Sequence, residues 1–146
     1  MPEPGTVLAF DYGTRWIGVA VGDRALGSAH PLERLDATSR EASAAAIARL
    51  IEAWHPVELV VGVPRPDLGQ ADPLTRSARA FGRALGRRHA LPVVEVDERY
   101  TSVDAASRLR EAGARPQHRR TRNDPHAACV ILEDYHARRA AAERAA

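Results

Sequence analysis

The chain contains no lysine, one cysteine and few aromatic residues, which make up 5% of it. A single cysteine, Cys129, excludes an intrachain disulfide and a cysteine-rich zinc site. No apolar run approaches the length of about 20 residues that a membrane-spanning helix requires. The first residues, 1–5, lack the basic and apolar regions of a secretory signal. We therefore expect a cytoplasmic protein with no membrane partner.

The residues that are present suit one folded domain. Hydrophobic residues are 45% and charged residues 27% of the 146 positions, close to the average for globular proteins. All 21 basic residues are arginine, and the formal net charge is only +2. The guanidinium fork suits phosphate, but so mild an excess indicates a nucleic-acid partner only where it is clustered. We expect one domain over residues 1–146, with 139–146 a fraying helical tail.

Short apolar runs predict a sheet that begins with a hairpin. Residues 7–10 form an apolar run that ends at Asp11, and 17–21 form a second run after the turn 12–15. Strands this close in sequence pair antiparallel. A weaker third strand is expected over 29–35, and the runs 59–63 and 93–97 predict two more strands.

Helical spacing fills the rest of the chain. Thr38 and Glu41 fit a capping box for a helix that places Ile47, Leu50, Ile51 and Trp54 on one face. Asp72 and Pro73 begin a second helix, whose buried side would carry Leu74, Ala78, Phe81 and Leu85. Further helices are expected over 101–109 and from Asp124 onward. Strands joined through helices run parallel, so we predict an α/β fold with a mixed five-stranded sheet flanked by helices.

Three acids stand where regular structure changes: Asp11 ends the first strand, Glu98 follows the last, and Asp124 begins the final helix. If the first and last strands lie close together, these carboxylates share one pocket, where Mg²⁺ or Mn²⁺ would offset their repulsion. Such an ion supports phosphodiester hydrolysis. Taken singly, Asp11 could shape the turn, Glu98 could be a rim charge, and Asp124 before Pro125 could be a helix cap.

The segment 8–23 resembles the opening motif of the YqgF (RuvX) family of RNase H-like Holliday-junction resolvases, which are also assigned to processing the 5′ end of pre-16S rRNA. Residues 60–64, 96–102 and 124–135 match further blocks of that family in the same order. The resemblance implies an RNase H-like fold and a metal-dependent nuclease. It also implies that Asp11, Glu98 and Asp124 are the catalytic, metal-binding carboxylates.

Other residues are candidates for contact with nucleic acid. Thr14 and Arg15 in the first turn could donate to a phosphate, or could simply form a solvated hairpin tip. Arg99 could pair with a carboxylate or with substrate, and Thr101 could bind phosphate or cap a helix. Trp16 could stack on a base or pack, and His126 is expected at the surface. Four arginines in the segment before Asp124 predict a clamp on a phosphate backbone: Arg115, Arg119, Arg120 and Arg122.

Two other classes of function remain open from the sequence. A non-catalytic nucleic-acid-binding module would explain the arginines, although three acids would repel its ligand. An actin-like nucleotide phosphotransferase uses a similar Asp-x-Gly-Thr hairpin but needs two such domains. The pattern does not distinguish a DNA four-way junction from pre-16S rRNA as substrate. A junction would predict a two-fold homodimer, because its symmetric strands need paired cuts.

Overall fold

The computed structural model of the chain describes residues 5–98 and 123–145. Its regular elements are, in chain order, β1 (Thr6–Asp11), β2 (Trp16–Asp23), β3 (His30–Asp36), α1 (Arg40–Trp54), β4 (Glu58–Val63), the 3-10 turn η1 (Gly69–Ala71), α2 (Pro73–His89), β5 (Val93–Asp97) and α4 (Pro125–Ala145). All five predicted strands are present. The helix predicted over 101–109 lies outside the described residues.

The five strands form one mixed sheet in the order β3-β2-β1-β4-β5. β1 pairs antiparallel with β2 and parallel with β4, and β5 runs parallel to β4. The predicted hairpin and mixed sheet are therefore confirmed. β1 lies at the centre because its residues are apolar on both faces, as a strand covered by helices on both sides requires.

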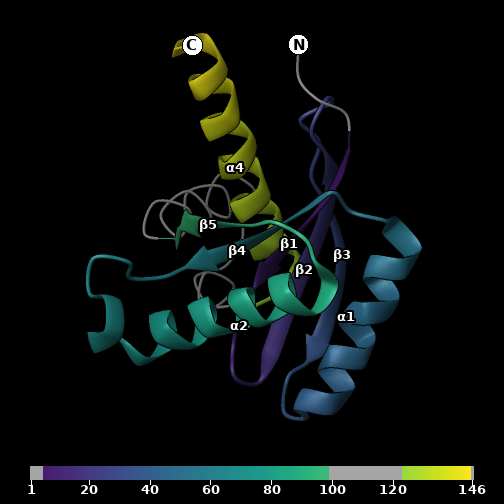
Figure 1. The fold of residues 1–146 in the computed structure, drawn as a ribbon, viewed down its shortest axis with the longest axis vertical. Helices are drawn as coiled ribbons and strands as arrows, with labels where there is room; N and C mark the ends of the chain where they lie inside the picture. Colours follow the sequence, from purple (N-terminus) through teal and green to yellow (C-terminus); the bar gives the residue numbers. More distant parts are fainter. Residues whose placement is uncertain (1–4, 99–122, 146) are drawn as a thin grey trace, which may run out of the picture.

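Helices cover both faces of this sheet (Figure 1). Alternation along β1 sends Leu8 and Phe10 toward α1 and α2, where Ile47 joins the same core. Val7 and Ala9 point the other way, into a second core with residues of α4. We call these two sides the α1/α2 face and the α4 face.

The start of α1 differs from the prediction. Ser39, not Thr38, is the N-cap, and its side chain accepts a hydrogen bond from the Ala42 backbone N–H. The Thr38 hydroxyl instead donates to Asp36 at 2.6 Å, so Thr38 and Glu41 form no capping box. Trp54 was expected on the buried face, but it is 41% exposed at the last turn of the helix. Because the Thr38 hydroxyl bonds Asp36, the N-cap lies one residue later than predicted.

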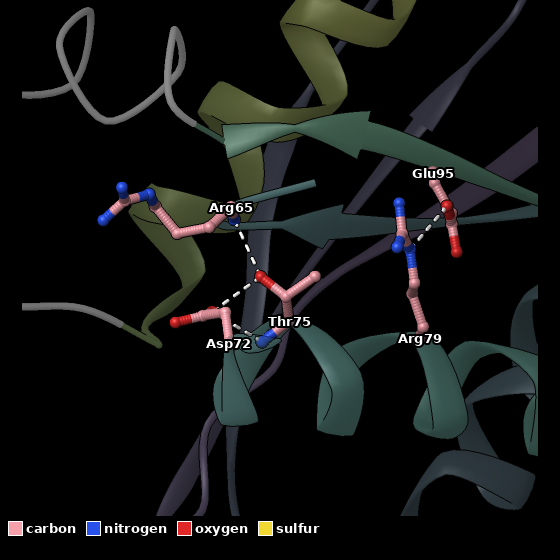
Figure 2. Close-up of polar contacts among 5 residues, drawn as sticks. All are labelled: Arg65, Asp72, Thr75, Arg79 and Glu95. Atoms are coloured by element: carbon pink, nitrogen blue, oxygen red, sulfur yellow. Dashed lines mark hydrogen bonds and ion pairs between the residues drawn. The ribbon is translucent and has the colours of Figure 1, made fainter. Parts of the chain in front are cut away.

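The connection from β4 to α2 is held by polar contacts (Figure 2). The buried Thr75 hydroxyl accepts a hydrogen bond from the Arg65 backbone N–H at 2.8 Å and donates to Asp72 at 2.7 Å. Asp72 also caps α2 by accepting from the Thr75 backbone N–H, as the sequence predicted. Farther along the helix, Arg79 pairs with Glu95 of β5 at 3.3 Å. These contacts hold α2 against the end of β4 and the middle of β5.

α4 lies along the other face and buries a stripe of side chains that includes Cys129, Ile131, Leu132 and Tyr135. The Tyr135 hydroxyl donates to Glu58 at the start of β4. Burial and this neighbouring carboxylate raise the pKa of Tyr135 to about 12. Residues 139–145 continue the helix with mostly exposed side chains. Within the described part of the chain, no helix is long and apolar enough to cross a membrane.

Candidate nuclease site

Asp11 is the last residue of β1 and is only 4% exposed. It pairs with Gly18 of β2, and the parallel register Phe10–Val61, continued by one residue, places it beside Gly62 of β4. Val7 and Ala9 point to the α4 face, so by alternation Asp11 does also. A buried carboxylate thus lies between two residues that have no side chain.

Gly18 allows the start of α4 to approach the sheet. A Cβ atom at this position would collide with the backbone of Asp124, with its Cα lying 2.7 Å away. The glycine therefore brings the beginning of α4 directly over β2, in the position next to Asp11. This is the close backbone approach that an interior strand glycine often marks.

Gly62 allows the Glu98 side chain to approach the sheet. A Cβ atom here would lie 2.7 Å from both Cγ and Oε1 of Glu98, and 2.6 Å from Cδ1 of Ile131. The Glu98 side chain therefore folds over β4 on the α4 face, beside Asp11. The three predicted acids come to one end of one sheet face, with Asp11 between the other two.

Asn123 is a site residue that the sequence analysis did not single out. Its backbone N–H donates to Asp11 Oδ2 at 2.6 Å, and its side-chain Nδ2 donates to the Tyr12 carbonyl at 2.9 Å. Its φ is +61°, in the left-handed region that asparagine tolerates better than most residues. Gly13 has no room for a Cβ because the Asn123 amide fills that space. Asn123 thus joins the β1–β2 turn to the start of α4 and orients the Asp11 carboxylate.

Asp124 has the capping role that the sequence suggested. Its Oδ1 accepts the Ala127 backbone N–H at 2.7 Å, and Pro125 occupies the first helical position. Oδ2 has no hydrogen bond within the described residues. Capping therefore uses one oxygen and leaves the other for a second role.

The donor set is chemically suited to a hard divalent cation, because it consists of carboxylate oxygens. Because Gly18 and Gly62 have no side chains, the Asp124 backbone and the Glu98 side chain occupy the two positions that flank Asp11. Within residues 5–98 and 123–145, no three His, Cys, Asp or Glu side chains lie as close together as metal ligands do. The residue types and their shared edge therefore fit a metal, while the ligand set itself is a proposal.

The structure places some of the predicted nucleic-acid contacts and not others. Thr14 and Arg15 lie exposed in the β1–β2 turn, at the same end of the sheet as Asp11, and His126 is exposed as expected. Cys129 is buried, and burial raises the pKa of its thiol to about 11, so it has no nucleophilic character at neutral pH. The remaining predicted contacts lie outside the described residues: Arg99, Thr101, Arg115, Arg119, Arg120 and Arg122.

Solved structures with the same fold include two resolvases bound to junction DNA. T. thermophilus RuvC in complex with a Holliday junction matches over 92% of this chain and 95% of its own, at 18% identity and a TM-score of 0.57. The fowlpox virus resolvase matches over 91% of this chain and 97% of its own, at 13% identity and a TM-score of 0.57. The fold is therefore RNase H-like, as predicted.

Proteins found by sequence comparison have higher identity to this chain than these two structures. A protein of Dechloromonas aromatica named "Putative pre-16S rRNA nuclease" is 47% identical over 90% of each chain. Proteins with the same name from Nitrosospira multiformis and Chromobacterium violaceum are 45% and 51% identical, over 92% and 74% of this chain and 89% and 79% of their own. The model of the RuvX family, described as Holliday junction resolvase, matches residues 5–138. The chain belongs to the RuvX family.

Proposed function

We propose that this protein is a nuclease that uses Mg²⁺ or Mn²⁺ to hydrolyse phosphodiester bonds in structured nucleic acid. The observation that carries the proposal is the convergence of Asp11, Glu98 and Asp124 at one end of the α4 face. The nuclease names of relatives that are 45–51% identical support it. A binding module has no evident use for three acids beside its ligand, because they would repel phosphate.

Asp11, Glu98 and Asp124 would hold the metal. When bound, such an ion activates a water molecule and stabilises the charge that develops on the phosphodiester. The protein's contribution is positional: Asn123 fixes the Asp11 carboxylate by a 2.6 Å hydrogen bond, and the first turn of α4 fixes Asp124. Burial of Asp11 also keeps its carboxylate largely away from bulk solvent.

We assign the precursor of 16S rRNA as the first substrate to test, because the closely similar relatives carry that name. The description of the family model supports a four-way DNA junction as the second. A junction would require a two-fold homodimer with one site in each subunit. Action on precursor rRNA would place the protein in the cytoplasm. The arginines of 115–122 would supply affinity for the phosphate backbone without taking part in the chemistry.

The test is a cleavage panel of end-labelled pre-16S rRNA fragments, four-way junctions and linear duplexes, each with Mg²⁺, Mn²⁺ or chelator. We expect metal-dependent cuts at defined positions in one structured substrate. Glu98→Gln should remove most of this activity, and adding Asp124→Asn should cost little more, as for groups that serve one step. The matched control is Glu52→Gln, because Glu52 is exposed on helix α1. Binding in chelator with no cleavage of any substrate would support the binding-module alternative.

A further inference from the structure

Two arginines gather on one tryptophan beside the candidate site. The Arg34 guanidinium carbon lies 4.1 Å from the centroid of the Trp16 ring, and that of Arg15 lies 5.6 Å from it. Both arginines are exposed, and Trp16 is partly buried. A cation–π contact at these distances orients a guanidinium but gives its N–H groups no hydrogen-bond acceptor.

The sheet register ties this cluster to Asp11. Arg34 of β3 pairs with Gly18 of β2, which in turn pairs with Asp11 of β1. Leu35 and Ile17 point into the α1/α2 core, so Arg34 and Trp16 belong to the α4 face by alternation. With strands about 4.8 Å apart, the Cα atoms of Arg34 and Asp11 lie about 10 Å from each other.

The nearby carboxylates in the described part of the chain do not form ion pairs with Arg15 or Arg34. Neither Arg15 nor Arg34 forms an ion pair within the described ranges. Asp36 pairs with Trp16 across the strands, and its Oδ1 accepts hydrogen bonds from the backbone N–H and the hydroxyl of Thr38. These bonds, and to a lesser degree Arg15, lower the pKa of Asp36, so it stays ionised without binding either guanidinium.

We propose that Arg34, held over the Trp16 ring, binds a backbone phosphate of the substrate next to the bond that is cut, with Arg15 as a second cation. A guanidinium held in this way keeps its N–H edge for a phosphate and loses little further side-chain freedom on binding. Trp16 is thus a positioning residue that acts through Arg34. This inference rests on the proposed nuclease function, since it concerns the path of the substrate toward Asp11.

The test measures binding apart from cleavage. The protein carries Asp11→Asn and the buffer contains chelator, and the probes are a fluorescent RNA hairpin with a single-stranded 5′ extension and a DNA four-way junction. We expect Arg34→Ala to weaken binding of one probe roughly tenfold and to reduce the slope of log affinity against log salt by roughly 0.7 to 0.9. Arg34→Lys should keep the slope but recover only part of the affinity. Arg49→Ala, an exposed arginine of α1, is the control and should change neither quantity.

A double-mutant cycle tests the role of Trp16. Trp16→Leu should lower the binding affinity by no more than Arg34→Ala does. The variant that carries both changes should have the same affinity as Arg34→Ala alone. Additive losses would show that the indole binds substrate directly, and would overturn the positioning role. An Arg34→Ala variant that binds like Arg49→Ala would overturn the phosphate site. Thermal unfolding of each variant shows whether a loss reflects folding instead. Failure of the wild type to cleave any substrate would refute the nuclease proposal separately, whatever the binding results.

Discussion

The two faces of the central sheet are built from different residues. The α1/α2 face is filled by large side chains such as Phe10 and Leu59, and it still leaves a cavity of about 470 Å³ between the two helices. The α4 face has glycine at positions 18, 22 and 62, and each brings another segment within contact distance of the strand backbone. Large side chains keep helices at a distance, whereas glycines let polar backbone and carboxylates approach the strands. The α1/α2 face therefore forms a hydrophobic core, and the α4 face forms the candidate site.

The largest effect should come from adding one methyl group to the α4 face. Gly18→Ala would force a Cβ atom into the backbone of Asp124, which cannot move without displacing α4. We expect a loss of about 3 kcal/mol or more in the free energy of unfolding, together with loss of cleavage. Denaturant unfolding measures the first quantity.

The matched change on the other face is Gly82→Ala in α2. Its Cβ atom would lie 3.3 Å from Val93 Cγ1, a tight contact with a side chain, and alanine favours the helix by about 0.5–1 kcal/mol. We expect a change in the free energy of unfolding smaller than about 1 kcal/mol. Equal losses for the two variants would contradict the comparison between the faces.

Asp124→Asn separates the two roles of Asp124. Asparagine caps a helix about as well as aspartate, so stability should change by less than about 1 kcal/mol. The loss of a carboxylate should slow cleavage at least about tenfold, which is about 1.4 kcal/mol in the barrier. Single-turnover cleavage and thermal unfolding together measure both. Full activity in this variant would leave Asp124 as a helix cap and nothing more.

Tyr135→Phe tests how the middle of α4 is held against the start of β4. Glu58 would lose its donor, and we expect a loss of about 1 kcal/mol in the free energy of unfolding at neutral pH. The pKa of Tyr135 is raised from 10.0 to about 12, so its stabilising effect is complete below pH 10 and is lost as pH rises toward 12. Unfolding curves across this range should show that decline in the wild type and a smaller one in the variant.

The smallest effect should follow changes at Cys129. Cys129 is 6% exposed, and burial raises the pKa of its thiol to about 11, so it should react with a maleimide only when the protein unfolds. Cys129→Ala should leave the cleavage rate unchanged. Rapid labelling of the native protein, with loss of activity, would show that this part of the α4 face is open.

Much of this arrangement could be predicted from the sequence. Apolar runs that end in acids located β1 and its Asp11, and Asp124 before Pro125 located the start of α4. The position of the cap of α1 was not predictable, because Thr38 bonds Asp36 only in the folded turn. Asn123 was missed because its contacts to Asp11 and Tyr12 span more than 100 residues of sequence. The interior glycines of β2 and β4 were a usable signal for close approach, but what approaches them is a tertiary property.

The central claim is that Asp11 serves a metal-dependent cleavage reaction at the α4 face. Asp11→Asn tests it most directly, because asparagine keeps an oxygen to accept the Asn123 N–H at nearly constant volume. The account predicts that single-turnover cleavage with Mg²⁺ or Mn²⁺ falls at least about 100-fold, since a bound cation contributes several kcal/mol to the transition state. Unfolding temperature should change little, and substrate binding in chelator should be equal or tighter. Near-wild-type cleavage by the folded variant would contradict the account.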